Sequence, residues 1–405
     1  MSNASWIDIL KVKASIGQQG NDSIGQWAYV DLFQLIKNDD TSMSSSFYRK
    51  GNPEITWETT TNLNLGVEFS FWGGRLSGNV DWYRKKTSDL LFWVSIPESS
   101  GTRGMYQNIG DIRNSGIEFN ISADVIRTKM VTWNVAANIA HNKTKILSLP
   151  AAKTSNDLGG WSEATPNGYN SYWYKVGGEL NNVYLAHYEG VDEYGQAMFR
   201  KTIWKTDENG NYLLDSKGHR QVDHYTTTYD FNDATEYEHG CLMPDLFGGF
   251  STSLRVGNFD VSATFDYQIG GQVYDMHYQS LIGSVDTSAG AGTTFHKDYK
   301  KAWSPNNTKS DMPRWQYGDD YSTASSDRFL TDASYLNFQS FAVGYTIPEK
   351  LFKNHLKMRI YVAGENLCFW SARQGLDPRY AFEGNTSVTG YSPARTISGG
   401  LQLTF

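Results

Sequence analysis

Three histidines lie in one polar stretch of the chain and are the first residues to examine for metal chemistry. They are His219, His224 and His239. Imidazole nitrogens are common zinc ligands, but ligands that share a helix turn or a strand face recur at regular spacings. These spacings match neither a helix nor a hairpin face, so the sequence favours a surface loop over a metal site. We expect no metal ion and no cofactor.

Two acidic segments in the same stretch resemble parts of a calcium loop. The first reads Asp-Glu-Asn-Gly-Asn over 207–211, but its glycine is misplaced and no glutamate closes the twelve-residue frame. An Asn-Gly pair is a common signal for a tight hairpin turn. We therefore predict a turn here, and a second one at 215–218, where the chain reads Asp-Ser-Lys-Gly.

Motifs for catalysis are lacking from the sequence. It contains no nucleophile elbow, no zinc-protease motif, no phosphate-binding loop and no dinucleotide fingerprint. Cys241 and Cys368 are far apart and lack CxxC spacing, so they either pair through the fold or remain as buried free thiols. The net charge of −7 disfavours a nucleic-acid partner. The sequence thus favours transport or binding, and we predict that the protein is not an enzyme.

The elements that would position any functional side chain are strands with period-two patterns. The last stretch, 395–405, places Ile397, Leu401, Leu403 and Phe405 on one face and polar residues on the other. Similar strands are expected around short turns in four hairpins, with arms at 63–71 and 76–82, 117–125 and 133–139, 252–256 and 259–269, and 336–345 and 356–362. Another strand is expected at 10–16, ending at Gly17.

Long segments separate these hairpins and carry most of the hydroxyl and acidic residues. They are roughly 18–58, 145–182, 207–245, 271–333 and 368–393. Strands of about ten residues, joined alternately by short turns and long loops, are typical of a transmembrane β-barrel. A soluble sandwich has shorter strands and lacks this asymmetry. We predict an all-β, antiparallel transmembrane barrel fragment. It has ten long strands, or twelve if a strand pair at 184–189 and 197–202 belongs to it.

The composition agrees with many strands and few helices. Aromatic residues make up 14% of the chain, and it contains 38 glycines but 10 prolines. The mean hydropathy of −0.51 and the lack of a long apolar run exclude membrane helices from this sequence. The first residues lack the basic and apolar regions of a signal peptide. For a membrane barrel, this predicts that the true beginning of the protein is missing.

Several short motifs, in this order and spacing, resemble the SusC/RagA-like TonB-dependent outer-membrane transporters of Bacteroidetes. They include KASIG at 13–17, NPEITWE at 52–58, DWYRKKTSDLL at 81–91, NIGDIRNSGIE at 108–118, MPDLFGGF at 243–250, ASYL at 333–336, GYTIP at 344–348, GENL at 364–367 and GLDP at 375–378. The resemblance spans nearly the whole chain. It implies a barrel of about 22 strands with an N-terminal plug. Short turns would face the periplasm and long loops the cell exterior.

The resemblance further implies import of glycans, oligosaccharides or peptides across the outer membrane. The expected partners are a SusD-like surface lipoprotein and the TonB-ExbB-ExbD system, and Phe405 would act as a signal for the outer-membrane assembly machinery. Residues 1–405 would be the C-terminal part of the barrel, without the plug, the TonB-contacting segment and the first strands. Loop aromatics are candidate substrate contacts, namely Trp161, Tyr172 and Trp173. The alternatives are a soluble or secreted carbohydrate-binding β protein and a passive porin or adhesin.

A half barrel has two unpaired edges, which are costly in lipid. We therefore expect a curved sheet of ten to twelve antiparallel strands, either open or closed into a smaller barrel. The isolated chain should not take up substrate.

Overall fold

The structure is a computed structural model dominated by antiparallel strands. It describes residues 4–38, 42–95, 99, 104–150, 157–164, 171–283, 295–319, 321–352, 356–380, 386 and 392–404. Within these residues, no helix is both long and apolar enough to cross a membrane. The prediction of an all-β fold is confirmed.

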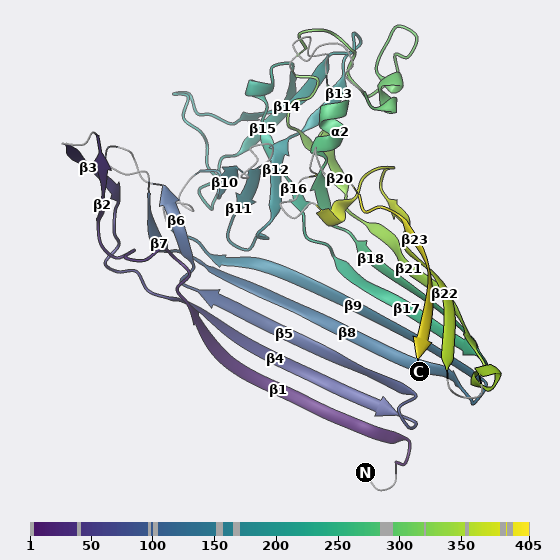
Figure 1. Ribbon diagram of the computed structural model, residues 1–405. Helices are drawn as coiled ribbons and strands as arrows, with labels where there is room; N and C mark the ends of the chain where they lie inside the picture. The colour runs from purple at the N-terminus through teal and green to yellow at the C-terminus, as the bar shows by residue number, and fades with distance from the viewer. Residues whose placement is uncertain are drawn as a thin grey trace.

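Ten long strands form one continuous, curved, antiparallel sheet (Figure 1). Its order is β1-β4-β5-β8-β9-β17-β18-β21-β22-β23, so strands that neighbour each other in space follow one another along the chain. The bounds are β1 Ile7–Asn21, β4 Glu58–Phe71, β5 Leu76–Ser88, β8 Asp111–Arg127, β9 Val131–Ser148, β17 Leu246–Val256, β18 Phe259–Ile269, β21 Tyr335–Ile347, β22 Lys357–Ser371 and β23 Thr396–Thr404. All four predicted hairpins are present, and β1 continues four residues beyond the expected end at Gly17.

The connections between these strands alternate in length, as predicted. Short turns join β4 to β5, β8 to β9, β17 to β18 and β21 to β22, the last through the 3-10 turn η6 (Glu349–Phe352). They lie at the same end of the sheet as both chain termini, and the long connections lie at the opposite end (Figure 1). Within the described residues, β1 and β23 are the sheet edges and do not pair with each other, so the sheet is open. Phe405 lies outside the described residues.

The sheet has one apolar and one polar face because side chains alternate along each strand. The apolar face remains open to the surroundings, and Val362 and Leu401 each keep 57% of their surface exposed. A water-soluble sheet would bury such a face, whereas a membrane barrel presents it to lipid. The sheet therefore has the side-chain distribution of a membrane barrel wall.

Aromatic rings cover cross-strand glycines at three places in the sheet. Tyr83 lies opposite Gly116, Phe69 opposite Gly78 and Tyr361 opposite Gly400. A Cβ atom at Gly400 would come 2.4 Å from the Tyr361 hydroxyl, and one at Gly116 would come 2.6 Å from that of Tyr83. Glycine is thus required at these positions, because the rings pack too closely on the backbone to leave room for a side chain.

The long connections are not simple polar loops, which corrects the sequence-based expectation. The segment between β9 and β17 folds into two small sheets, and the segment between β18 and β21 forms a strand pair and short helices; together we call these two segments the loop assembly. The first sheet contains β10 Trp161–Ala164, β11 Ser171–Tyr174, β12 Asn182–Ala186 and β16 Glu236–Cys241. The second contains β13 Tyr188–Val191, β14 Ala197–Trp204 and β15 Val222–Thr228. The remaining elements are η2 Phe231–Asp233, β19 Gln272–Tyr274, α2 Met276–Leu281, η4 Lys297–Lys301, η5 Asp327–Phe329 and β20 Leu330–Asp332.

The predicted strand pair at 184–189 and 197–202 falls in this loop assembly. Strands β13 and β14 pair around the turn at 192–195, but neither joins the large sheet. The number of strands in the wall is therefore ten, and the alternative of twelve is wrong. Smaller hairpins also occupy the first two long connections, formed by β2 Leu32–Lys37 with β3 Met43–Arg49 and by β6 Leu91–Ser95 with β7 Gly104–Asn108.

The loop assembly has a hydrophobic core of its own. Its buried residues come from distant parts of the chain and are Val183, Leu185, Tyr274, Ile282, Met312 and Phe329. Each short strand alone buries little apolar surface, so the pieces depend on one another for stability. The assembly sits over the end of the sheet opposite the short turns (Figure 1).

Candidate functional site

The polar face of the large sheet carries a row of side chains that are partners in register across seven strands. The row runs through Glu68, Asn79, Asn120, Asn138, Gly249, Asp266 and Asn337. Residues from all seven of these strands, with Lys13 of β1, line a cavity of about 1000 Å³ against this face. Such a row arises because each strand places every second residue on the same side.

Hydrogen bonds hold several of these polar groups in place. The Gly249 amide donates to Asn138 Oδ1 at 2.9 Å, and Asn337 Nδ2 donates to Asp266 Oδ1 at 2.7 Å. Lys13 Nζ lies 3.5 Å from Asp81 Oδ1 and 3.9 Å from Glu68 Oε2. Amides and carboxylates arranged in this way can exchange hydrogen bonds with the hydroxyl or peptide groups of a passing solute.

The predicted loop aromatics occupy two faces of the small hairpin β10-β11. Trp161 packs on Tyr174 with ring centroids 4.8 Å apart, and Tyr172 lies 6.4 Å from the same ring. Trp173 points to the opposite face, stacks on Tyr184 at 4.5 Å and is only 5% exposed. Trp173, one of the three candidate substrate contacts, therefore packs inside the loop assembly and does not present an exposed ring.

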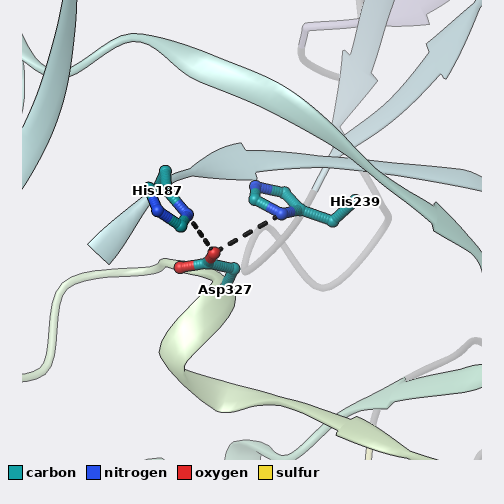
Figure 2. Close-up of side chains that lie close together, drawn as sticks. All are labelled: His187, His239 and Asp327. Atoms are coloured by element: carbon teal, nitrogen blue, oxygen red, sulfur yellow. Dashed lines mark hydrogen bonds and ion pairs between the residues drawn. The ribbon is translucent and has the colours of Figure 1, made fainter. Parts of the chain in front are cut away.

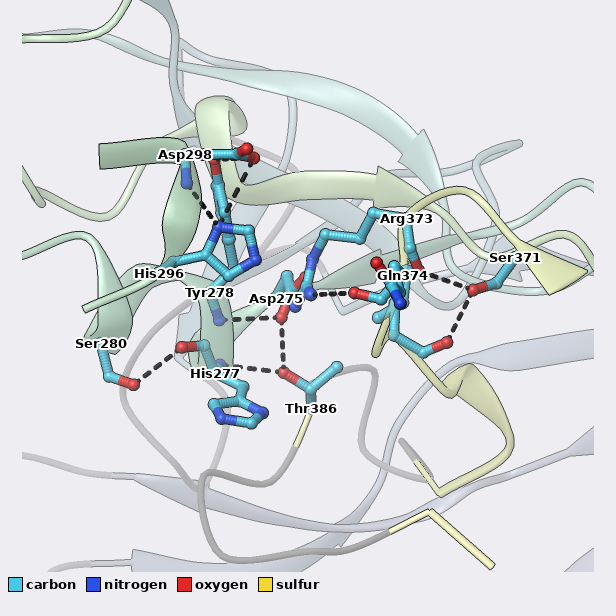
Figure 3. A network of polar contacts seen from close by, with 11 residues as sticks. Asp275, His277, Tyr278, Ser280, His296, Asp298, Ser371, Arg373, Gln374 and Thr386 are labelled. Carbon is cyan, nitrogen blue, oxygen red and sulfur yellow. Dashed lines mark hydrogen bonds and ion pairs between the residues drawn. The ribbon is translucent and has the colours of Figure 1, made fainter. Parts of the chain in front are cut away.

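A buried ion pair joins the loop assembly to the connection that follows β22 (Figure 3). Asp275 is fully buried, caps α2 by accepting the Tyr278 amide at 3.0 Å, and accepts the Thr386 hydroxyl at 3.1 Å. Arg373 donates to the same carboxylate through Nε at 2.5 Å and also through Nη2. A buried carboxylate needs such partners because leaving it unpaired in the interior is costly.

Near this pair, further contacts hold the start of η4 in place. His296 Nδ1 accepts the Asp298 amide at 3.2 Å and so caps η4. Tyr278 donates its hydroxyl to Asp298 at 3.2 Å, and the Arg373 guanidinium lies 5.0 Å from the Tyr278 ring centre. Burial lowers the pKa of His296 from its usual value, despite the opposing effect of Asp298. The imidazole is thereby kept neutral, as its role as an acceptor requires.

The turns predicted at 207–211 and 215–218 are confirmed. Asp207 accepts the amides of Asn209 at 2.8 Å and Asn211 at 2.9 Å, and Asp215 accepts those of Lys217 and His219 at 2.7 and 2.9 Å. Each carboxylate thus closes its own turn. Hydrogen bonds lower the pKa of both aspartates below the usual value: the largest cause is the Asn211 side-chain amide for Asp207 and the His219 backbone amide for Asp215.

The three histidines do not come together, but one of them meets a different histidine. His219 belongs to the second turn, and His224 lies on β15 with an exposed side chain. His239 instead lies on β16 with a side chain that is 13% exposed, so the surface-loop interpretation is wrong for this residue. Figure 2 shows His239 and His187 directed at the carboxylate of Asp327 from two sides. Sequence reasoning missed this cluster because its members are 52 and 88 positions apart.

Neither cysteine forms a disulfide. Cys368 is exposed on β22, whereas the Cys241 thiol on β16 is largely shielded, and burial raises its pKa to about 11. A thiol with a raised pKa is a poor nucleophile at neutral pH. Of the two alternatives left open by the sequence, the cysteines are free thiols, and Cys368 is exposed instead of buried.

Comparisons with known proteins agree with this architecture. The model of the family described as "TonB dependent receptor-like, beta-barrel" matches residues 3–367. The TonB-dependent receptor P3 of Formosa agariphila is 29% identical over 426 residues, an alignment covering 100% of this chain and 40% of that protein. The TonB-dependent receptor SusC of Bacteroides thetaiotaomicron is 28% identical over 420 residues, covering 100% and 38%.

Among solved structures, the RagAB peptide importer in its closed-closed state matches with a TM-score of 0.78 and 25% identity. The match covers 99% of this chain and 41% of that one. The chain thus spans about two fifths of the length of the curated relatives and solved structures it resembles.

Proposed function

The chain belongs to the TonB-dependent receptor-like β-barrel family, and on that basis we propose that it forms ten strands of the wall of an outer-membrane importer. In this proposal residues 1–405 are the C-terminal part of the barrel, and a plug and a TonB-contacting segment precede them in the complete protein. The function is energised transport driven by TonB-ExbB-ExbD, without a catalytic step. The cargo is a glycan, an oligosaccharide or a peptide.

The contrast between the two faces of the large sheet carries this proposal. One face is apolar and exposed, with Val362, Leu401 and Ile397 as prominent examples, and the other carries the row of amides and carboxylates. Lipid on the first side and a hydrated lumen on the second satisfy both faces. A soluble carbohydrate-binding protein would have to leave the apolar face in water, so this alternative is disfavoured.

The alternating connections suggest how the wall is oriented. In the proposal the short turns face the periplasm, and the loop assembly faces the cell exterior beneath a SusD-like lipoprotein. In the same proposal, Phe405 is the signal that the outer-membrane assembly machinery would read.

The cargo would meet side chains of both regions. The row at Asn79, Asn120 and Asn138 offers donors and acceptors that suit sugar hydroxyls and peptide groups alike. Above it, Trp161 and Tyr172 share one face of their hairpin and could stack against a sugar ring or an aromatic side chain. Trp173 would act through packing beneath them, because its own ring is buried.

The experiment is uptake of labelled oligosaccharides and peptides by cells that produce the protein. Asn120→Trp places a large ring on the lumen face, and the matched control Ile121→Trp places the same ring on the lipid face one residue further along. We expect the first variant to lower uptake and the second to leave it unchanged. Uptake that persists when the proton gradient is collapsed would indicate a passive pore and overturn the proposal. Cells that produce only these 405 residues should take up nothing.

A further inference from the structure

We propose that His187, His239 and Asp327 form a binding site for a Zn²⁺ ion within the loop assembly. Each residue offers one ligand atom, and these atoms lie within 4.8 Å of one another. His187 lies between β12 and β13, His239 lies on β16, and Asp327 begins η5. The proposed site consists of these residues alone and is independent of what the barrel transports.

The hydrogen bonds of His239 determine which of its nitrogens can bind a metal. Its Nε2 lies 3.0 Å from the backbone oxygen of Leu185. A carbonyl oxygen only accepts hydrogen bonds, so Nε2 must carry the ring proton. In the neutral ring, Nδ1 then has a free lone pair, and this nitrogen faces Asp327 Oδ2 at 3.5 Å.

A lone pair and a carboxylate oxygen repel each other unless a proton or a metal cation lies between them. A metal ion bound to both removes the repulsion, and the Nε2 bond to Leu185 is the kind of second contact that metal-binding histidines make. The carboxylate is held in the same way, because the Tyr188 amide donates to Asp327 Oδ1 at 2.8 Å and leaves Oδ2 for the ligand role. Both ligands are thus positioned by the backbone.

One ligand distance is close to that of a tetrahedral ion, and the side chain of His187 must move to satisfy the other two. Zinc bonds of about 2.0 to 2.1 Å place neighbouring ligand atoms about 3.3 Å apart in a tetrahedron. The pair His239 Nδ1 and Asp327 Oδ2 already has this spacing. His187 Nδ1 now bonds directly to the same oxygen at 2.5 Å, so its ring must retreat by about 1 Å. The side chain of His187 is partly exposed, which allows this shift and leaves room for a water as fourth ligand.

The types of ligand select the class of metal. Two imidazoles with one carboxylate suit zinc and similar transition metals, whereas calcium and magnesium require mostly oxygen ligands. The next acidic group, Glu189, lies 4.0 Å from His187 Nε2 and is already paired with Arg200. A bound ion would join three segments that are distant in sequence, and so hold both small sheets and η5 together.

The test uses protein purified in detergent without a histidine tag, stripped with a chelator and titrated with Zn²⁺. We expect one Zn²⁺ per chain, and a d–d absorption band typical of tetrahedral geometry when Co²⁺ replaces it. His239→Gln removes the Nδ1 ligand, while its amide can still donate to Leu185 O. It should weaken Zn²⁺ binding at least about 10-fold. The control His224→Gln alters an exposed histidine of β15 and should bind as wild type does.

Two results would overturn the site: wild-type protein that binds no Zn²⁺, or His239→Gln protein that binds it as tightly as wild type. Amide exchange of β16 shows whether the variant keeps its fold. If it does not, Asp327→Asn decides, since the amide oxygen can still accept the Tyr188 N–H. Unchanged Zn²⁺ affinity in a folded Asp327→Asn protein also refutes the proposal.

Discussion

Replacing Arg373 with methionine should loosen the attachment of α2 by about 3 kcal/mol at pH 7. The substitution keeps much of the side-chain volume and removes the cation that faces the fully buried carboxylate of Asp275. Breaking a buried pair from one side costs about 3 to 5 kcal/mol. We expect the lower part of this range, because the Tyr278 amide and the Thr386 hydroxyl remain as hydrogen-bond donors.

Amide exchange of α2 and β19, followed by mass spectrometry in detergent, measures this effect. A loss of about 3 kcal/mol raises exchange about 100-fold over wild type at the same pH. The control Lys201→Met breaks an ion pair with Asp233, whose side chain is 56% exposed, and should cost less than about 1 kcal/mol. Equal exchange of α2 and β19 in the two variants at pH 7 would contradict a stabilising role of the buried pair.

Two other predictions concern the loop assembly and the wall. The pKa of His296 is lowered in the folded protein, so protonation favours the unfolded state; the region around η4 should be fully stable above about pH 6.5 and lose protection as the pH falls toward the folded value. Exchange of η4 between pH 7 and 5 measures this loss, and His296→Asn, which keeps a capping oxygen, should abolish the pH dependence. On the wall, Val362→Lys should destabilise the barrel in lipid by about 2 to 4 kcal/mol, while Ala363→Lys, one residue along and on the lumen face, should cost much less. Denaturant titration in vesicles compares them, and equal losses would contradict the assignment of the two faces.

The wall could be predicted from the sequence because its strands are long and one face meets a uniform surrounding. In β4, for example, Leu65, Val67 and Phe69 alternate with polar residues over many positions, so the pattern is visible without knowledge of the partner strands. The alternation of short turns and long connections between these strands then predicted a barrel.

The loop assembly could not be predicted in the same way. Its strands are short, and its core joins Val183, Ile282 and Phe329, which are far apart in sequence. No local periodicity encodes such contacts. For the same reason, proximity in the sequence grouped His239 with His219 and His224, whereas the fold places it beside His187.

The three aromatic rings that pack over glycines favour one register of the wall strands over the others during folding. A strand that slips by two residues keeps its polar and apolar faces, so alternation alone would not detect the error. After such a slip, Tyr83 would meet a residue with a side chain in place of Gly116, and the same would hold for Tyr361 and Gly400. The rings could then not keep their present position over the partner strand, so the shifted register would lose this close packing. These ring–glycine pairs would then help to select the correct register as the barrel folds, because the hydrophobic patterns of the strands are nearly interchangeable.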